Sequence, residues 1–516
     1  MLIMPANLVT ILVTIVLYLA MMVAIGVCFS NRNLSSGQFY LGGRSLGPLV
    51  TAMSAEASDM SGWLLMGLPA VALMTGLPEA VWTAVGLAVG TYINWLVVAR
   101  RLRVYTQKVD AFTLPDFFSR RFGDKKKILT IIAALFIIIF FVPYTASGFA
   151  ACGKLFASLF GIDYVLAMVL SAAVIILYCA LGGFLAASTT DFIQSIIMTI
   201  ALFVVVGFGA VTTGGFGSVV ANVSSLDGYL DLFRGYNVAS GSVMSYGALP
   251  VVSTLAWGLG YFGMPHILLR FMAIKDKEKL ALSRRVASVW VVISMGVAIL
   301  IGVIGYSLMK NAVVPTYGSA SAAETIIVDI AKVISGNGIL PAIVAGVILA
   351  GILASTMSTA DSQLLAAASS ISQNLVQEVF GIKLSNKASV WLARISVVII
   401  SIVAVFLARD PNSSVFKIVS FAWAGFGAAF GPLVLFSLFW KRTTKWGAIA
   451  GMVSGGAMIF IWKFVVRTAF AGTWLDIYEL LPAFLVASLV IVVVSLLGKK
   501  PEAEIIETFE AVKAEN

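Results

Sequence analysis

Apolar stretches long enough to cross a membrane follow one another along nearly the whole chain. An α-helix of about 20 apolar residues spans a hydrocarbon core of roughly 30 Å. Such stretches lie at residues 8–29, 47–74, 80–99, 128–158, 164–186, 190–213, 248–272, 286–309, 339–370, 389–407, 415–440, 446–465 and 478–498. The pattern therefore predicts an all-α polytopic membrane protein with about 13 transmembrane helices.

Polar residues interrupt two of these apolar stretches. The second contains Ser54-Ala-Glu-Ala-Ser-Asp-Met-Ser-Gly-Trp63, and the ninth contains Ala354-Ser-Thr-Met-Ser-Thr-Ala-Asp-Ser-Gln363. On insertion scales, an aspartate at the centre of a bilayer costs about 2.5–3.5 kcal/mol. Polar groups at that depth usually face a cavity, and a broken helix adds free backbone carbonyls there. We therefore expect a discontinuous second span beside a binding site. A patch that only joins helices is the alternative.

The spacing in the ninth span gathers oxygen atoms on one helix face. Ser358 lies three residues before Asp361 and four before Ser362, so the three side chains share a face. Hard cations such as sodium prefer oxygen ligands. The hydroxyls could instead bond carbonyls of their own helix. Asp191, at the start of the sixth predicted span, is a further candidate, although it could simply cap that helix.

Aromatic and glycine residues form a second cluster, in the seventh predicted span. Trp257 and Tyr261 are four residues apart and lie on one helix face, and Pro265 breaks the helix after them. Tyr144 follows Pro143 in the fourth span. The glycines between the aromatic residues allow a ligand or a neighbouring helix to approach. Packing alone is the alternative role for such a stripe.

Composition and charge argue against several other classes of function. Hydrophobic residues make up 60% of the 516-residue chain and charged residues 11%, against roughly 25% charged residues in soluble domains. The net charge of +10 does not indicate nucleic-acid binding, because the basic residues lie in short loops. A single histidine and three separated cysteines cannot build a zinc site or a histidine-based triad. We expect no cofactor and no enzyme activity. A membrane enzyme built on paired aspartates and an ion channel are the more distant alternatives.

The basic loops also predict an orientation. They follow the third, seventh, eleventh and thirteenth predicted spans, which places them all on one side if the spans alternate. By the positive-inside rule that side is cytoplasmic. We therefore expect a multi-pass protein of the plasma membrane, with its N-terminus outside and its C-terminus in the cytoplasm.

Several motifs together resemble one family. They are Gly42-Gly-Arg-Ser-Leu-Gly-Pro48, Ala57-Ser-Asp-Met-Ser-Gly-Trp63, Trp257-Gly-Leu-Gly-Tyr-Phe-Gly263 with Pro265-His266, Met357-Ser-Thr359, and Ala422-Trp-Ala-Gly-Phe-Gly-Ala-Ala-Phe-Gly-Pro432. Over nearly the whole chain, the sequence resembles the sodium/proline symporters of the solute:sodium symporter family. The first and third motifs together are typical of the proline branch.

The resemblance implies a leucine-transporter-like fold in one transmembrane transporter domain, residues 1–516. Inverted five-helix repeats are implied at 47–213 and 248–440, an extra N-terminal span at 8–29, two C-terminal spans at 446–498 and a cytoplasmic tail at 499–516. The implied activity is symport of sodium and L-proline by alternating access, with the lipid bilayer as environment and no obligatory protein partner. Another organic solute, such as pantothenate, a sugar or sialic acid, is the alternative substrate.

The resemblance also implies roles for individual residues. The backbone carbonyls of Ala57, Met60 and Ser355 and the hydroxyls of Ser358 and Thr359 would bind sodium, and Asp59 would couple sodium to transport. Ser61, Gly62, Tyr144, Trp257, Tyr261 and Pro265 would act in proline binding or coupling, and Arg44 would be a functional cytoplasmic residue. A second sodium site would use Asp191, Ser358, Asp361 and Ser362.

Three residues depart from the pattern of that family. Glu56 stands in place of glycine, Met264 in place of glutamine and Ser355 in place of alanine. Glu56 adds a second carboxylate beside the expected sodium site, and with Asp361 it leaves proton coupling open as an alternative. A serine at position 355 is harmless if only its carbonyl binds the ion.

Overall fold

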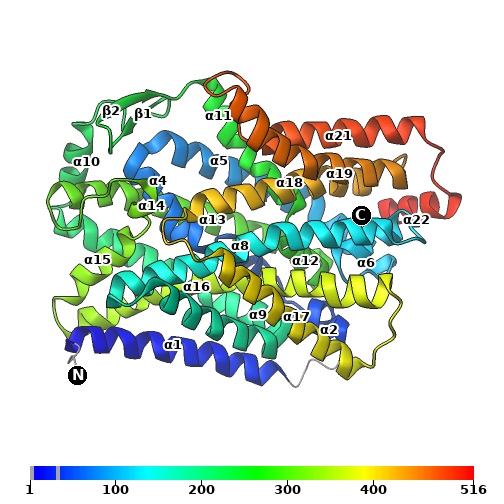
Figure 1. Cartoon of the computed structure of the whole chain (residues 1–516), viewed down its shortest axis with the longest axis horizontal. Helices are drawn as coiled ribbons and strands as arrows, with labels where there is room; N and C mark the ends of the chain where they lie inside the picture. Colours follow the sequence, from blue (N-terminus) through cyan, green and yellow to red (C-terminus); the bar gives the residue numbers. More distant parts are fainter. Residues whose placement is uncertain (1–4, 31–34, 516) are drawn as a thin grey trace.

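Long helices dominate the computed structural model, which describes residues 5–30 and 35–515 (Figure 1). The longest are α1 (Ala6–Ser30), α5 (Leu77–Ile93), α8 (Ile128–Phe160), α9 (Tyr164–Thr212), α13 (Leu280–Lys310), α16 (Ile339–Ser369), α17 (Asn386–Leu407), α18 (Val415–Phe439), α19 (Lys445–Ile461) and α21 (Leu480–Leu497). Within the described ranges, 10 helices are long and apolar enough to cross a membrane, or up to 11 with one bent pair. This confirms the predicted all-α polytopic membrane fold.

The predicted number of 13 spans depends on how two interrupted regions are counted. It takes α9 as two spans and the shorter helices of residues 248–273 as one. At Gly183, inside α9, φ is 63° and ψ is −164°, which is a conformation that glycine adopts readily. Leu170 and Leu12 line one groove, Tyr178 lies against Gly26, and Gln194 donates a hydrogen bond to Tyr18. The chain therefore turns back along α1 at Gly183, and the count of 13 stays a prediction.

The predicted break in the second span is present. It separates α3 (Pro48–Asp59) from a short wide turn, η2 (Trp63–Gly67), and α4 (Leu68–Thr75). The two parts of the span are bent by 58°. The residues at the break, Met60 to Gly62, are buried among neighbouring helices, so their backbone groups are available at membrane depth.

A second interrupted helix lies in the predicted seventh span. It consists of α11 (Ala248–Leu255), η4 (Ala256–Gly263) and α12 (Pro265–Ala273). Met264 between them has an extended backbone, with φ −77° and ψ 108°, and Pro265 is the first residue of α12. Proline suits that position because the first turn of a helix does not need its N–H. Both predicted repeats thus begin with an interrupted helix, although the inverted symmetry itself stays a prediction.

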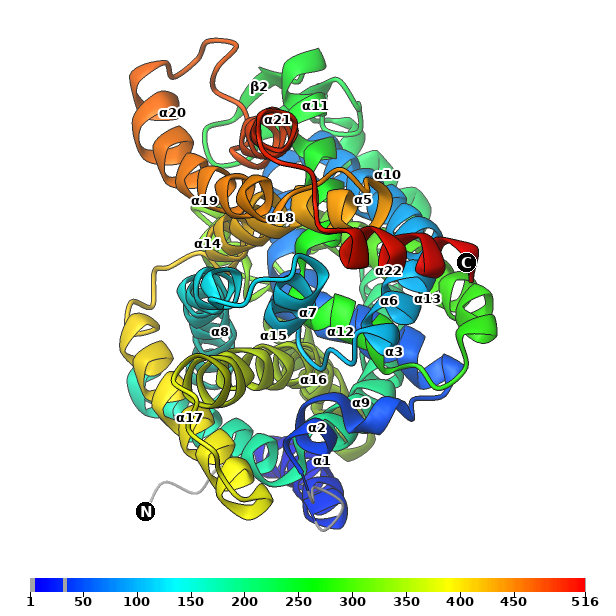
Figure 2. The ribbon, with the colours of Figure 1, turned by 90° about the vertical axis from the view of Figure 1, so that its right-hand side faces the viewer.

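Short elements gather at the two ends of the bundle. At one end lie α10 (Phe216–Ser224), the antiparallel strands β1 (Arg234–Asn237) and β2 (Ser242–Ser245), α14 (Ala320–Ala323) and α15 (Ile326–Ser335). At the other end lie α2 (Ser36–Leu41), η1 (Gly42–Arg44), α6 (Ala99–Lys108), α7 (Leu114–Arg121) and α22 (Ala503–Ala514). Figure 2 shows this second end, where α22 lies across α6.

The remaining short segments extend or connect the long helices. They are η3 (Asn94–Val98), which joins α5 to α6, η5 (Lys277–Lys279), η6 (Ser370–Val379), which continues α16, η7 (Trp462–Val466) and α20 (Arg467–Ala469). The C-terminal tail thus forms a helix, α22, up to Ala514, and residue 516 of the predicted tail lies outside the described residues.

Candidate functional site

The two interrupted helices meet at Asp59, the last residue of α3. The phenol of Tyr261, in η4, donates a hydrogen bond of 2.5 Å to Oδ2 of Asp59. The phenol of Tyr144, in α8, donates a hydrogen bond of 3.5 Å to the backbone carbonyl of the same residue. All three side chains are buried. The structure therefore brings the predicted coupling carboxylate together with two of the predicted substrate-binding residues.

Four of the five predicted sodium ligands form one hydrogen-bonded group. The Ser358 hydroxyl donates to the carbonyls of Ala57 at 2.8 Å and Ser355 at 3.3 Å. The Thr359 hydroxyl donates to the Ser355 carbonyl at 3.2 Å. These oxygens contact one another directly, so a cation would have to separate them. Carbonyl and hydroxyl oxygens are the ligands that a hard cation prefers.

The fifth predicted ligand, Met60, lies at the break itself. It is the residue at which α3 ends, and its carbonyl accepts a hydrogen bond of 3.3 Å from the amide of Leu64. Among the described residues, no group of three or more histidine, cysteine or acidic side chains could hold a metal ion. Any cation here would therefore rely on neutral oxygens and Asp59.

An aromatic cluster covers Asp59 and Tyr261. The ring of Trp257 lies 5.9 Å from Trp63, 5.4 Å from Phe416 and 5.3 Å from Tyr478, measured between centroids. Trp423, in α18, stacks edge-on against Tyr261 at 5.0 Å and donates a hydrogen bond of 2.7 Å to the carbonyl of Trp257. These residues close the site toward the end of the bundle that carries β1 and β2.

The other predicted substrate residues lie around the break in different roles. The Ser61 hydroxyl accepts a hydrogen bond of 3.1 Å from the amide of Trp63. A Cβ on Gly62 would lie 3.0 Å from Ala151 and 3.3 Å from the Thr356 hydroxyl, so Gly62 permits close packing of three helices. Pro265 is buried and begins α12. Its position at the first turn of α12 shapes the interrupted helix.

A second polar cluster contains a charged side chain, Arg270, that was not predicted from the sequence. The buried guanidinium of Arg270, in α12, pairs with Asp191 at 3.0 Å and also donates to the hydroxyls of Ser54 and Ser362, at 3.0 and 2.5 Å. A lone arginine in the apolar run Ile267–Ala273 was the signal that could have revealed it.

Asp361 completes this second cluster. It accepts hydrogen bonds from the Tyr178 phenol at 2.9 Å and from the Ser362 hydroxyl at 3.0 Å. The Ser362 hydroxyl also donates to the carbonyl of Ser358 at 2.9 Å. The structure thus brings together all four residues of the predicted second sodium site, and it adds a cation, Arg270, beside them.

Arg44 lies apart from both clusters, at the end of the bundle that carries α22. Its guanidinium donates to the carbonyls of Met272 and Ala111, each at 2.7 Å, and to the carbonyl of Thr106 at 3.1 Å. Its backbone is left-handed, with φ 56°, which is uncommon for a residue other than glycine. Arg44 therefore joins η1 to the ends of α6 and α12.

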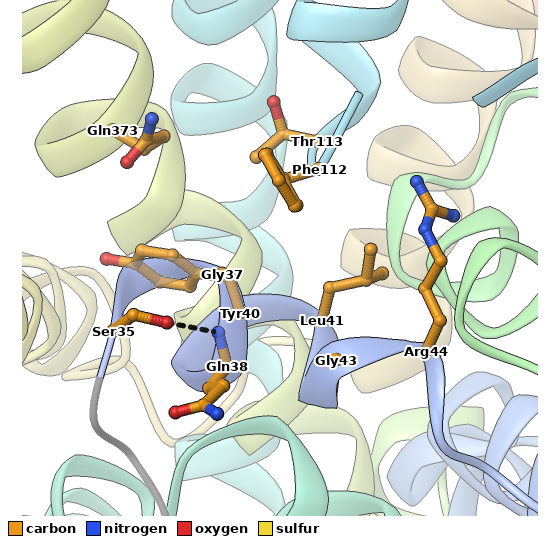
Figure 3. A pocket seen from close by; sticks show the side chains of 10 residues that line it. All are labelled: Ser35, Gly37, Gln38, Tyr40, Leu41, Gly43, Arg44, Phe112, Thr113 and Gln373. Carbon is orange, nitrogen blue, oxygen red and sulfur yellow. Dashed lines mark hydrogen bonds between the residues drawn. The ribbon is translucent and has the colours of Figure 1, made fainter. Parts of the chain in front are cut away.

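A cavity of about 400 Å³ opens beside Arg44 (Figure 3). Phe112 and Thr113 lie across it from Tyr40 and Leu41. A narrower cavity of about 10 Å³ shares Tyr40, Phe112 and Thr113 and reaches Arg270 and Ser362. The two cavities together lead from the end that carries α22 toward the second polar cluster.

The chain is similar in sequence to known proteins over almost its whole length. The sequence profile described as the Sodium:solute symporter family matches residues 39–455. The chain is 44% identical to the sodium/proline symporter of Haemophilus influenzae, over 97% of both chains. It is 41% identical to the sodium/proline symporter of Escherichia coli, over 98% of this chain and 96% of that one. It is 42% identical to the high-affinity proline transporter PutP of Bacillus subtilis, over 95% and 98%.

Solved structures share the fold. A Na⁺-coupled sialic acid symporter, in a substrate-bound outward-open state, superposes with a TM-score of 0.77 at 16% identity, over 96% of this chain and 99% of that chain. MhsT in complex with L-phenylalanine gives a TM-score of 0.51 at 13% identity, over 88% and 98%. These structures confirm the predicted leucine-transporter-like fold. The profile that matches residues 39–455 and the sequence identity of more than 40% over nearly the whole chain show that the chain belongs to the sodium:solute symporter family.

Proposed function

We propose that this protein is a secondary active symporter that couples inward sodium flux to the uptake of L-proline. Relatives that are 41–44% identical over nearly the whole chain are named sodium/proline symporters. The structural observation that carries the proposal is the contact between Ser358 and the carbonyl of Ala57, next to the Tyr261–Asp59 hydrogen bond. These contacts join an oxygen-rich site to the aromatic cluster around Trp257 and Tyr261. The protein is then a transporter and not an enzyme.

Sodium would bind between α3 and α16. Its ligands would be the carbonyls of Ala57, Met60 and Ser355 and the hydroxyls of Ser358 and Thr359. This assignment is supported by the direct contacts among four of these residues. Asp59, two residues after Ala57, would contribute negative charge without being a direct ligand. Bound sodium would order the break that follows Asp59.

Proline would bind next to this ion. As a zwitterion, it carries a carboxylate that the amide groups at the break, near Ser61 and Gly62, could bind, and an apolar ring that fits against Trp257 and Tyr261. Tyr144 and Pro265 would complete the pocket by fixing Asp59 and the start of α12. Another organic solute, such as pantothenate, a sugar or sialic acid, is the alternative substrate.

Alternating access would couple the two ligands. Binding of one favours binding of the other, since coupling free energy is reciprocal. A membrane potential of 100 mV contributes about 2.3 kcal/mol per charge, and a tenfold sodium gradient adds about 1.4 kcal/mol. One sodium ion could therefore support roughly 500-fold accumulation of proline. The aromatic cluster lies on one side of the site, and the cavity beside Arg44 lies on the other. We expect this arrangement in a carrier that is closed at one end.

The proposal includes the location of the protein and its orientation in the membrane. Multi-pass insertion follows from the helices, and we place the protein in the plasma membrane. The N-terminus would lie outside and the C-terminus in the cytoplasm, because the basic loops lie at the end that carries α6, α22 and Arg44. No cofactor and no protein partner is needed for this mechanism.

Asp191, Ser358, Asp361 and Ser362 form one candidate site for a second coupled sodium ion. Arg270 already pairs with Asp191 and contacts Ser362. The two carboxylates and one guanidinium still leave one negative charge in the cluster. An ion here would therefore share its ligands with Arg270.

Uptake by the purified protein in proteoliposomes tests the proposal. A sodium gradient directed inward is expected to drive accumulation of labelled proline, and a proton gradient without sodium is not. An excess of unlabelled pantothenate, glucose or sialic acid should leave uptake unchanged. Accumulation driven by protons alone, or competition by one of those solutes, would contradict the assignment of the ion or of the substrate.

A further inference from the structure

A buried glutamate on the broken span has an oxygen without a partner. Glu56 lies in α3, one turn before Asp59, and is fully buried. Its Oε1 accepts hydrogen bonds from the Thr91 hydroxyl at 3.0 Å and from the Trp95 indole N–H at 2.9 Å. Its Oε2 accepts none from the described part of the chain. A buried polar atom of this kind requires an explanation, because leaving it unpaired is unfavourable.

Asn94 offers a second buried oxygen on the neighbouring helix. It follows Thr91 by three residues, so both side chains lie on the face of α5 and η3 that bonds Glu56. Its Nδ2 donates a hydrogen bond of 3.0 Å to the carbonyl of Tyr261. Because that partner can only accept, the orientation of the amide is fixed. Oδ1 then has no hydrogen-bond partner among the described residues.

The charge around these oxygens is unbalanced. Glu56 and Asp59 lie three residues apart on α3, and both side chains are buried. Neither carboxylate forms an ion pair with a lysine or arginine of the described chain. Asp191, by contrast, has Arg270 as its partner. An unpaired carboxylate is costly to bury, so each of these groups requires either a bound proton or a bound cation.

We propose that Oε2 of Glu56 and Oδ1 of Asn94 are ligands of a second sodium ion, on the side of α3 that faces α5. Carboxylate and amide oxygens are hard ligands that suit a small cation. The first proposed ion lies on the side of α3 that faces α16, where the carbonyl of Ala57 meets Ser358. Each of the two ions would balance one carboxylate. This inference rests on the proposed sodium symport and adds a second coupling ion to it.

The number of coupled ions tests this inference. Purified protein in proteoliposomes is brought to equilibrium under a series of sodium gradients, with the membrane potential clamped to zero. The slope of the logarithm of the proline accumulation ratio against the logarithm of the sodium ratio gives the number of sodium ions per proline. We expect a slope of about two for the unchanged protein and about one for Glu56→Gln. Glutamine keeps the size of the side chain and an acceptor for Thr91 and Trp95.

Matched variants separate this site from other effects. Glu79→Gln makes the same change of charge in the first turn of α5, and Thr91→Val removes a donor to Oε1 while sparing Oε2. Both should keep a slope of about two. Asn94→Ala should raise the sodium concentration for half-maximal uptake about tenfold. A slope that falls in Asp361→Asn but not in Glu56→Gln would place the second ion in the Arg270 cluster and overturn the inference.

Other outcomes of these experiments distinguish failure of the Glu56 site from failure of the proposed function. A slope of about one in the unchanged protein would overturn the second site but leave sodium symport intact. Absence of any sodium-driven accumulation would instead contradict the proposed function. A proton-driven component that Glu56→Gln abolishes would show that Glu56 binds a proton, against the sodium assignment. If Glu56→Gln fails to fold, equilibrium binding of radioactive sodium to the unchanged protein decides, with two ions per chain expected and one contradicting the site.

Discussion

Tyr261 donates a hydrogen bond of 2.5 Å to Oδ2 of Asp59, and this bond joins the two helices that are interrupted within the membrane. Asp59 ends α3, and Tyr261 lies in η4 three residues before the break at Met264. A change of the bend at one of the two breaks would therefore also move the residues at the other break. The first of the proposed sodium ligands, Ala57, lies two residues before Asp59. The proposed ion site and the aromatic cluster are therefore connected through the Tyr261–Asp59 hydrogen bond.

Removing this link should weaken sodium binding. Tyr261→Phe keeps the ring that packs against Trp423 but deletes the hydrogen bond. A hydrogen bond to a charged group contributes about 1.5–3 kcal/mol, or roughly 10–100-fold in affinity. We expect the sodium concentration for half-maximal proline uptake to rise by at least about tenfold. Initial uptake rates measured over a range of sodium concentrations would show this.

Tyr229→Phe is the matched control for that variant. Tyr229 is equally buried, but its phenol donates to the carbonyls of Ala72 and Leu73, away from Asp59. Its sodium dependence should stay within about twofold of the unchanged protein. If both phenylalanine variants behaved alike, the effect of Tyr261 would be one of general stability and the proposed link would be wrong.

Ser358 and Trp257 should affect different ligands. Ser358→Ala removes a hydroxyl from the proposed sodium site, so the sodium requirement should rise by about tenfold or more. The proline concentration for half-maximal uptake at saturating sodium should change little. Trp257→Ala removes a wall of the aromatic pocket and should do the reverse. Kinetics with each ligand varied in turn would separate the two.

Ser370→Ala, at the start of the segment η6 that continues α16, serves as the control. Ser370 is buried like Ser358, but its hydroxyl donates only to the carbonyl of Ala366, one turn before it. We expect nearly unchanged sodium and proline dependence. Equal losses for both ligands in Ser358→Ala and Trp257→Ala would argue against separate roles.

Much of the fold could be predicted because apolar length alone marks helices that cross a membrane. The break in the second span was also predictable, since polar residues between Ser54 and Trp63 are costly in an unbroken helix. Boundaries were less accurate. The ninth span was expected to end at residue 370, but η6 continues the helix to Val379, because polar residues such as Gln373 and Asn374 end the apolar run without ending the helix.

The candidate site was predictable only where its residues are neighbours in the sequence. Ala57, Asp59, Ser358 and Thr359 lie in two short polar motifs, and helical spacing and the family resemblance pointed to them. Partners from other helices were missed, among them Arg270, Thr91, Trp95, Asn94 and Trp423. Their roles depend on which helix faces pack together, and a single sequence contains no record of that. Arg270 could have been suspected because a buried arginine requires a carboxylate.

The Arg270–Asp191 pair should be important for stability. Arg270→Met leaves Asp191 buried without a counter-ion, which costs about 3–5 kcal/mol when one partner of a buried pair is removed. We expect a clearly lower unfolding temperature in detergent. Adding Asp191→Asn should restore part of the loss, because the unpaired charge is then gone. Thermal unfolding of both variants would measure this.

An exposed ion pair provides the comparison for Arg270. Arg100 pairs with Glu278, and their side chains are 35% and 63% exposed. Arg100→Met should therefore cost no more than about 1 kcal/mol. If Arg270→Met were as mild as this variant, Arg270 would have little part in holding α12 against α9, and its role in the second cluster would need another explanation.

Packing of α5 against the second interrupted helix depends on a glycine. A Cβ on Gly86 would lie 2.6 Å from the carbonyl oxygen and 2.9 Å from the Cα of Leu255. Backbone atoms cannot move aside as a side chain can, so Gly86→Ala should displace α11 and η4. Overpacking of this kind costs about 1–3 kcal/mol. Because η4 carries Trp257 and Tyr261, proline affinity should fall together with the unfolding temperature.

Gly296→Ala tests whether this effect is specific to the contact. Gly296 lies inside α13, and a Cβ there would have no heavy atom within 4 Å. Alanine is the better helix former by about 1 kcal/mol, so this variant should be at least as stable as the unchanged protein and should transport normally. Equal loss of uptake in both alanine variants would mean that helix flexibility, rather than the close approach of α5 to Leu255, is what transport requires.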